Sequence, residues 1–337
     1  MVQRAFITGI TGMVGSHLVD FLIENTDWEI YGFLRWNDRL DNIEHHFDRI
    51  NNKDRVHLLY GDLNDLPSLE KAVKESQPDY VFHLAAQSYP KTSFDAPLET
   101  LQTNIIGTAN LLESLKQFGK KDVIVHNCAS SEIFGRVPKE KLPIDEECSI
   151  HPASPYAISK VGTDLLGRYY GEAFGMKVIS TRMFTHTGPR RGDVFSESTF
   201  AKQIAMIEAG LQEPTIYVGN LDSLRTYADV RDAVKAYYLL VTTNPIAGEY
   251  YNIGGTYTCK IEDMLNYLIS QSTRDDIKVE IDPDRLRPID ADLQVPNTEK
   301  FRKHTGWEPE YTFEQTMNDL LDYWRNEIKK GRKFLRR

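Results

Sequence analysis

Cysteine is scarce in this chain. Its 337 residues include only Cys128, Cys148 and Cys259, which are too few and too scattered for a disulfide framework or a zinc cage, so no metal site is expected. Long hydrophobic runs are missing too, and no stretch approaches the length of a membrane span. The first residues form an apolar strand pattern and a glycine turn rather than a signal or transit peptide. These absences predict a cytoplasmic protein with no membrane partner.

Positive charge is also in deficit. The 40 Lys and Arg residues are outnumbered by 49 Asp and Glu residues, which gives a formal net charge of −9. Because general nucleic-acid binders are basic, this balance argues against a nucleic-acid partner. Low-complexity segments and internal repeats are absent, and the hydrophobic share of 41% is ordinary for a globular chain. An anionic substrate held by a few local arginines remains compatible with this composition.

What the chain does contain is an alternation of short apolar segments with longer amphipathic ones. Six apolar segments have the composition of strands that are buried on both faces. They span 4–8, 29–34, 56–60, 80–84, 123–128 and 177–182. Helical patterns lie between them, for example at 104–118, where apolar residues recur every three or four positions. The alternation predicts an α/β protein with a doubly wound parallel sheet, that is, a modified Rossmann fold.

The pattern changes after residue 182. Pro189 and a short basic stretch interrupt it, and βα character returns only near residue 232. We therefore expect a second, smaller α/β lobe that leaves the sheet, rejoins it and leaves it again. The Rossmann lobe is expected to comprise 1–182 plus about 228–254, and the smaller substrate-binding lobe about 183–227 plus 255–337.

Three glycines at a spacing of three follow the first strand and open a helix. Such glycines permit a tight turn, close approach of the backbone to a pyrophosphate, and close packing of helix on sheet. The free N–H groups and the positive dipole end of the helix then face the phosphates. This context predicts a dinucleotide site, and the alternative is a tight turn that binds no ligand. The predicted cofactor-binding residues are Gly9, Thr11, Gly12, Met13, Val14 and Gly15.

The end of the second strand selects the cofactor. An acidic residue there would bind the ribose hydroxyls of NAD, but segment 32–37 contains none and offers Arg35 for a 2′-phosphate. NADP is therefore favoured, and the alternative is that Arg35 is a surface charge. Asp38 lies too far into the loop to be the usual ribose ligand, but it stays open as an alternative. Asp62, just after the third strand, is expected to border the adenine or to be a turn aspartate.

A tyrosine and a lysine lie one helical turn apart. Tyr156 and Lys160 share a helix face, and a nearby ammonium lowers the pKa of a phenol by stabilising the phenolate. Such a tyrosine can transfer a proton to or from a sugar hydroxyl while hydride goes to a nicotinamide. The spacing alone is unspecific. It gains weight from Ser130 and Glu132, which follow a parallel strand at the edge where doubly wound folds place their chemistry.

Together these features resemble the extended short-chain dehydrogenase/reductase family of nucleotide-sugar enzymes. The similarity covers nearly the whole chain, and it is greatest to the GDP-mannose 4,6-dehydratases and the related GDP-4-keto-6-deoxymannose reductases. Segment 200–240 is as similar to the reductases as to the dehydratases. The segments that carry the resemblance are 8–15, 84–88, 130–135, 156–160, 188–192, 219–222, 225–232, 287–288 and 305–307.

The resemblance implies a reaction. Ser130, Tyr156 and Lys160 match the hydride-transfer triad: Tyr156 would take the proton of the sugar O4 while C4 gives hydride to NADP. Glu132 matches the dehydratase base that removes the C5 proton; water then leaves from C6, and hydride returns to C6 to give GDP-4-keto-6-deoxymannose. A reductase or 4-epimerase would not need Glu132, which would then cap a loop. A regulatory NADP-binding protein would need none of the four residues.

The resemblance also implies binding residues. Further cofactor contacts are expected from Asp62, Leu63, Leu84, Ala85 and Ala86, together with Tyr156 and Lys160. A GDP-sugar would be bound by Ser88, Thr185, Arg191, Lys202, Arg225, Arg287 and Asp290. Thr185 stands where the dehydratases have asparagine, which puts the placement of the sugar in question.

Two histidines and two helices complete the expectations. His83 lies on a buried strand, so a hydrogen-bonded core histidine is favoured over a proton-transfer role; for His186 both roles stay open. The helices at 104–118 and 154–174 carry enough apolar surface to pack against a partner. A family-like homodimer built on a four-helix bundle is expected, with a homotetramer as the alternative.

Overall fold

The larger lobe is built on a seven-stranded sheet whose strands all run parallel. The computed structural model describes residues 2–286 and 291–331. The strand order is β10-β6-β5-β4-β1-β2-β3. The strands are β1 (Arg4–Thr8), β2 (Glu29–Leu34), β3 (Val56–Tyr60), β4 (Tyr80–His83), β5 (Ile124–Cys128), β6 (Lys177–Met183) and β10 (Tyr250–Ile253). The predicted α/β doubly wound sheet is confirmed, and the six strands expected in the first half form within one residue at each end.

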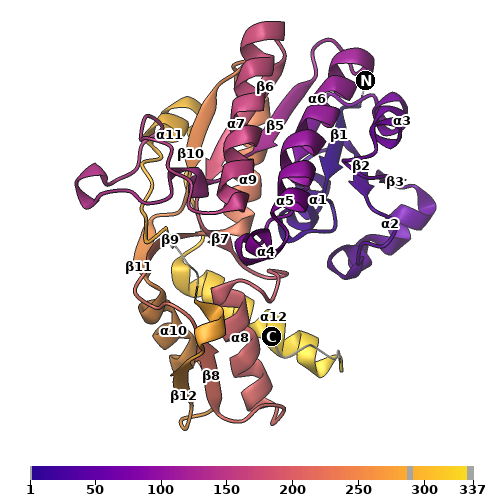
Figure 1. The fold of residues 1–337 in the computed structure, drawn as a ribbon. Helices are drawn as coiled ribbons and strands as arrows, with labels where there is room; N and C mark the ends of the chain where they lie inside the picture. Colours follow the sequence, from indigo (N-terminus) through magenta and orange to yellow (C-terminus); the bar gives the residue numbers. More distant parts are fainter. Residues whose placement is uncertain (1, 287–290, 332–337) are drawn as a thin grey trace.

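Helices cover both faces of this sheet (Figure 1). On one face, α1 (Met13–Asn25) and α9 (Val230–Thr242) lie side by side; on the other lie α3 (Leu66–Ser76), α6 (Gly107–Phe118) and α7 (Pro155–Phe174). Shorter helical segments connect these elements. They are η1 (Asp41–His46), α2 (Phe47–Asn52), α4 (Pro90–Asp95), α5 (Pro97–Leu101), η2 (Gln102–Ile106), η3 (Ser131–Phe134) and η4 (Lys139–Lys141).

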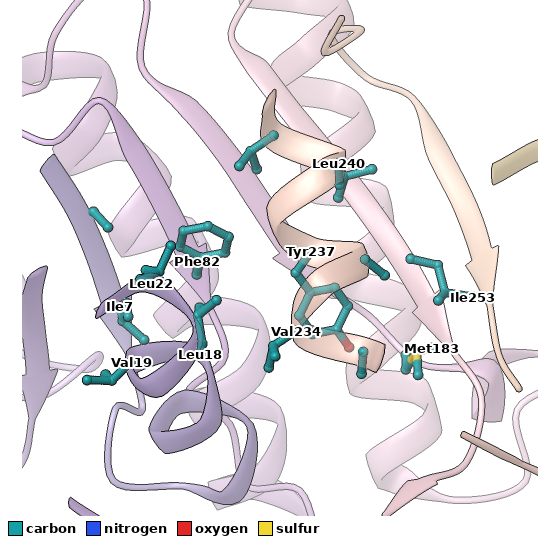
Figure 2. Close-up of a cluster of buried hydrophobic side chains, with 14 of the residues drawn as sticks. Ile7, Leu18, Val19, Leu22, Phe82, Met183, Val234, Tyr237, Leu240 and Ile253 are labelled. Carbon is teal, nitrogen blue, oxygen red and sulfur yellow. The ribbon is translucent and has the colours of Figure 1, made fainter. Parts of the chain in front are cut away.

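The period-two alternation of a buried strand divides the core in two. Ile7 points into the cluster shared with α1 and α9, whereas its neighbour Phe6 belongs to the cluster under α3, α6 and α7. Figure 2 shows the first cluster, in which Leu18 and Leu22 of α1 lie on the same side of the sheet as Tyr237 of α9. Continuous apolar strands are the consequence of this burial on both faces.

The smaller lobe lies below the sheet in Figure 1. It contains α8 (Ser196–Glu208), α10 (Ile261–Ser270), η5 (Pro283–Arg285) and α12 (Phe313–Lys329). The pair β8 (Thr215–Val218) and β12 (Lys278–Ile281) is parallel. β9 (Leu224–Asp229) pairs with β7 (His186–Thr187) and β13 (Leu293–Gln294) in parallel and with β11 (Tyr257–Lys260) in antiparallel orientation. Apolar side chains from α8, α10 and α12 form its core.

The two lobes exchange segments. α9 and β10 return to the large sheet, and α11 (Glu299–Thr305) also packs there because Phe301 and the following Trp307 belong to its core. Part of the segment 255–337 therefore supports the Rossmann lobe rather than the smaller one. The proposed division of the chain into two lobes remains a prediction in other respects. Across residues 2–286 and 291–331, no helix is long and apolar enough to cross a membrane.

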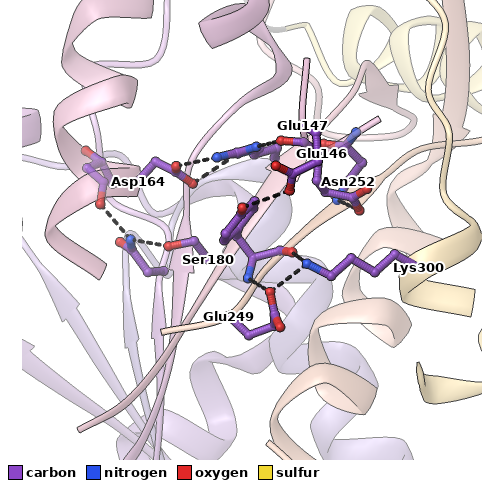
Figure 3. A network of polar contacts seen from close by, with 11 residues as sticks. Glu146, Glu147, Asp164, Ser180, Glu249, Asn252 and Lys300 are labelled. Atoms are coloured by element: carbon purple, nitrogen blue, oxygen red, sulfur yellow. Dashed lines mark hydrogen bonds and ion pairs between the residues drawn. The ribbon is translucent and has the colours of Figure 1, made fainter. Parts of the chain in front are cut away.

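Helix α7 is anchored by a buried polar network. Ser154 caps its N-terminus by accepting a hydrogen bond from the Ala157 N–H at 3.0 Å. Asp164, in the middle of α7, forms an ion pair with Arg182 of β6. Arg182 Nη2 lies 2.8 Å from one carboxylate oxygen of Asp164, and Nε lies 3.3 Å from the other. Figure 3 shows this network continuing to Glu146 and Asn252. The helix that carries Tyr156 and Lys160 is thus tied to the sheet beneath it.

Candidate active site

The glycine turn after β1 has room for backbone and no room for side chains. Gly9 has φ +73°, and a Cβ there would lie 3.0 Å from the Ala85 backbone. A Cβ on Gly15 would lie 2.3 Å from the Gly9 carbonyl oxygen. Gly12 is the N-cap of α1 and provides no side-chain cap, so the first N–H groups of this 13-residue helix stay available. The turn therefore fits a pyrophosphate, as predicted for a dinucleotide site.

Hydrogen bonds to the Thr8 side chain connect this turn to the segment that follows β4. The Leu84 and Ala85 N–H groups donate to Thr8 Oγ1, each at 3.1 Å, and the same hydroxyl lies 2.9 Å from His83 Nδ1. The other His83 nitrogen lies 3.0 Å from Thr108 Oγ1, and burial lowers the pKa of this histidine to about 3. Both ring nitrogens are satisfied, which agrees with a neutral core histidine.

Arg35 directly follows the last residue of β2, and its side chain is exposed. Its guanidinium pairs with Asp38, with Nε and Nη2 3.0 and 2.9 Å from the same carboxylate oxygen. Asp38 is therefore bound to Arg35 in this arrangement. Asp62 accepts the Asn64 N–H at 2.8 Å, which is the turn geometry considered for it. Buried Leu63 follows Asp62, and Met13 at the start of α1 is buried too.

Ser130, Tyr156 and Lys160 come together at the carboxyl end of β5. All three are buried, and the Ser130 hydroxyl lowers the pKa of the Tyr156 phenol against the larger effect of burial. Lys160 donates from Nζ to the Cys128 carbonyl oxygen at 2.7 Å, and Nζ lies 6.0 Å from the centre of the Tyr156 ring. The sequence predicted this chemistry at the carboxyl ends of the parallel strands, and these side chains meet there.

Burial dominates the ionisation of Tyr156. It raises the pKa of the phenol, and the Ser130 hydrogen bond and the positive charge of Arg191 oppose that shift, whereas Glu132 adds to it. Lys160 was expected to lower this pKa, but it is not among the main influences. Its ammonium donates to the Cys128 carbonyl oxygen. Burial also lowers the pKa of Lys160 itself.

Glu132 has a carboxylate without a partner. Within residues 2–286 and 291–331 it makes no hydrogen bond or ion pair through its side chain, while its N–H donates to Ser130 Oγ at 3.2 Å. Ser130 is the side chain that caps η3, so the loop-capping role considered for Glu132 is not the one seen. Its charge acts on Tyr156. A half-buried free carboxylate beside the tyrosine has the chemistry of a general base.

Arg191 is held at the same site. Its guanidinium lies 3.4 Å from the centre of the Phe195 ring, and Nε donates to Glu197 at 3.1 Å. His186 Nδ1 lies 3.1 Å from the Phe184 carbonyl oxygen; burial and then Arg191 lower the pKa of this histidine to about 4. A neutral His186 at pH 7 follows. Glu197 and Phe195 were not predicted, and spacing gave no signal for them because the contact joins a loop to the start of α8.

Three other residues predicted to bind the substrate contact neighbouring groups of the protein. Lys202 Nζ is 2.7 Å from Asp193 and buried. Arg225 donates to the carbonyl oxygens of Leu224 and Ala291. The Thr185 carbonyl accepts the Ala228 N–H at 2.9 Å, which ties the loop after β6 to β9. Arg287 and Asp290 lie outside the described residues, and no contact is assigned to Ser88 or Ala86.

The fold and the site define a class: a dinucleotide-binding nucleotide-sugar enzyme of the extended short-chain dehydrogenase/reductase type. A family model described as GDP-mannose 4,6 dehydratase matches residues 6–320. The chain therefore belongs to the GDP-mannose 4,6 dehydratase family.

Individual relatives differ in activity. The chain is 33% identical over 332 residues to GDP-6-deoxy-D-mannose reductase of Pseudomonas aeruginosa, covering 98% of this chain and 99% of the relative. It is 29% identical over 352 residues to GDP-mannose 4,6-dehydratase of Yersinia enterocolitica, covering 95% and 93%.

Solved structures agree on the fold. RMD from Pseudomonas aeruginosa in complex with NADPH has a TM-score of 0.81 at 32% identity, covering 97% of this chain and all of the other. UDP-glucose 4-epimerase of Thermus thermophilus in complex with NAD has a TM-score of 0.82 at 26% identity, covering 96% and 99%. The likeness to proteins of different activity leaves the reaction to be argued from the site.

Proposed function

We propose that this protein is an NADP-dependent 4,6-dehydratase that converts GDP-mannose into GDP-4-keto-6-deoxymannose. The observation that carries this proposal is the Glu132 carboxylate, which has no hydrogen-bond or ion-pair partner among the described residues and whose charge raises the pKa of the Tyr156 phenol. Oxidation at C4 makes the C5 proton acidic, and water elimination then needs a base within the site. A pure reductase has no use for such a base.

The residues divide the work as follows. Ser130 holds the sugar hydroxyl, and Tyr156 accepts the O4 proton through a phenol oxygen that Ser130 and Arg191 help to ionise. Lys160 fixes the strand end through the Cys128 carbonyl. Glu132 then removes the C5 proton and can pass it to the departing C6 hydroxyl. The bound dinucleotide supplies the chemistry of taking a hydride from C4 and returning it to C6.

The cofactor proposal rests on Arg35. An exposed arginine at the end of β2, where NAD-dependent folds place an acid, suits the 2′-phosphate of NADP. The binding of Asp38 to Arg35 would have to yield to that phosphate. Titration with NADP and with NAD, followed by calorimetry, should show tighter binding of NADP; equal affinities would remove Arg35 as the selector.

A reductase acting on a GDP-4-keto-6-deoxy sugar is the second candidate. It is favoured by the 33% identity to GDP-6-deoxy-D-mannose reductase over nearly the full length of both chains. It would use Ser130 and Tyr156 in the opposite direction, with Tyr156 donating the proton to O4. Such an enzyme consumes one NADPH for each sugar reduced, whereas a dehydratase shows no net change of cofactor.

The proposed assembly is a homodimer built on α6 and α7. Several large apolar side chains on the outer faces of η2 and α7 are exposed: Ile106, Ile158, Leu165, Tyr169 and Phe174. Such a patch, on α7 and on the η2 segment that leads directly into α6, suits helix-on-helix packing with a second copy. Light scattering that gives the mass of a dimer or tetramer would support this assembly, and a monomer would refute it.

Mass spectrometry tests the activity. GDP-mannose incubated with the protein and NADP, without added reductant, should give a product lighter by one water. Glu132→Gln should bind NADPH like the unchanged protein and lose water elimination. Unchanged turnover in this variant would refute the mechanism. Oxidation of NADPH by a 4-keto sugar would identify the reductase, and NADP binding without any turnover would indicate a regulatory protein.

A further inference from the structure

A buried carboxylate lies at the junction of the two lobes. Glu197 is in the first turn of α8 and is 3% exposed. It accepts hydrogen bonds from Arg191 Nε and from Ser196 Oγ, both at 3.1 Å. A buried carboxylate costs several kcal/mol unless it is paired, and both the guanidinium and the helix N-terminus offset that cost here. The mechanism described above makes no use of this residue.

The ion pair restricts where Arg191 can lie. One face of the guanidinium stacks on Phe195 at 3.4 Å, and Phe195 in turn packs edge-on against Tyr89 with ring centres 5.8 Å apart. The pair with Glu197 engages Nε. Among the described residues the terminal nitrogens of Arg191 have no hydrogen-bond partner. Arginine combines rigidity, charge and free donors in this setting.

Arg191 is also electrostatically linked to the reacting tyrosine. Its positive charge favours the phenolate of Tyr156, and Tyr156 in turn favours the charged guanidinium. Four other groups influence the phenol: Cys128 of β5, Ser130 at the cap of η3, Glu132 of η3 and Tyr237 of α9. Lys160 of α7 is also near, with Nζ 6.0 Å from the centre of the Tyr156 ring. Besides Arg191, Ser196 donates a hydrogen bond to Glu197, and the charge of Glu197 acts on His186 and Tyr227.

We propose that Glu197 is a positioning residue for the reaction: its carboxylate fixes the guanidinium of Arg191 against Phe195, and the guanidinium held in this way stabilises the Tyr156 phenolate formed during proton transfer. This inference rests on the proposed function only in assuming that Tyr156 transfers a proton. It applies equally to a dehydratase and a reductase, because both pass through the same tyrosine. The ion pair between the loop after β7 and the start of α8 then couples the placement of the smaller lobe to the reactivity of the larger one.

Kinetics provide the first test. Glu197→Ala should lower kcat/KM at neutral pH by about tenfold and shift the apparent pKa of the catalytic tyrosine upward in the pH–rate profile. Glu197→Asp should recover most of the loss, and Glu197→Gln, which keeps a neutral acceptor, should lose less than Glu197→Ala. Glu208 supplies the matched control, since it pairs with Arg325 at the other end of α8. Glu208→Gln should leave the profile in place.

A double-mutant cycle asks whether Glu197 acts through Arg191. The double variant Glu197→Ala with Arg191→Ala should be no slower than Arg191→Ala alone, within about twofold. Additive losses would overturn the proposal, as would a Glu197→Ala variant whose pH profile is unchanged.

A chemical readout separates this inference from the activity. Phenylglyoxal modifies accessible arginines, and peptide mass spectrometry can follow Arg191. Release of the ion pair in Glu197→Ala or Glu197→Gln should accelerate the modification of Arg191, while Glu208→Gln should not. If no GDP-sugar is turned over, the proposed function fails but this comparison still decides the role of Glu197. Equal reactivity of Arg191 in all variants would overturn it.

Discussion

Asp164→Asn is expected to lower the midpoint of thermal unfolding by about 4–7 °C. Asp164 is fully buried in α7, and its partner Arg182 is 2% exposed. The substitution leaves the Arg182 charge inside the protein with only a neutral acceptor. Breaking a buried pair in this way costs about 3–5 kcal/mol. For 337 residues an unfolding entropy of about 0.7 kcal/mol per kelvin converts that cost into the stated shift.

The surroundings of Arg182 leave little scope for compensation. Its Nη1 already donates to the Glu146 carbonyl at 2.7 Å, and its guanidinium lies 4.2 Å from the centre of the Tyr250 ring. Water therefore has little access to the stranded charge. Because Tyr156 is on the same helix, eight residues before Asp164, loosening of this anchor should also reduce turnover.

Differential scanning calorimetry provides the measurement. The exposed pair of Arg302 with Glu308 supplies a control, since Glu308→Gln should move the midpoint by less than about 1 °C. Replacing both buried partners, Asp164→Leu with Arg182→Met, should cost less than Asp164→Asn because no charge is left behind. A midpoint for Asp164→Asn within about 1 °C of the unchanged protein would refute the reasoning.

Three further predictions concern the cofactor turn, pH and catalysis. Gly15→Ala should abolish NADP binding in calorimetry because its Cβ would lie 2.3 Å from the Gly9 carbonyl oxygen, whereas Gly192→Ala, with no neighbour closer than 3.9 Å, should bind normally. Burial lowers the pKa of His126 to about 3 from 6.5, so the unfolded chain binds the extra proton between these values and stability falls as pH drops below about 6.5. His126→Gln should reduce the fall in melting temperature between pH 7 and pH 5, and an unchanged slope would contradict the assignment. Tyr156→Phe should slow turnover by about 10²–10⁴-fold without changing NADPH affinity measured by fluorescence; activity near that of the unchanged protein would exclude it as the proton-transfer group.

Much of the fold was predictable because it depends on local pattern. Strands buried on both faces are continuous in apolar residues, and 4–8 and 29–34 were therefore recognised at the same bounds as β1 and β2. The caps of α7 are readable too, with Ser154 before Pro155 and Gly175 at φ +65° after the last turn. The packing of α11 on β10 was not predicted, because a seven-residue helix carries no mark of the lobe that it joins.

In the candidate site too, features that depend on local spacing were predicted, and contacts between distant segments were missed. Tyr156 was recognised from its spacing to Lys160, and Ser130 from its place after a parallel strand. The structure brings both side chains, buried, to the carboxyl end of β5. The direction of the Lys160 ammonium toward Cys128 was missed, because a spacing of four residues gives a helix face without giving the acceptor. The pairing of Lys202 with Asp193 was missed for a similar reason.

The sequence by itself determined the alternation of strands and helices, the glycine turn and the residues that can carry proton transfer. Each of these depends on residues that are near one another along the chain, where backbone geometry and spacing act directly. Only the tertiary structure decided that Glu132 has no side-chain partner within 2–286 and 291–331, that Glu197 holds Arg191, and that burial rather than Lys160 governs the pKa of Tyr156. These properties arise from desolvation and from charges brought together across segments distant in sequence, and no local pattern records such distances.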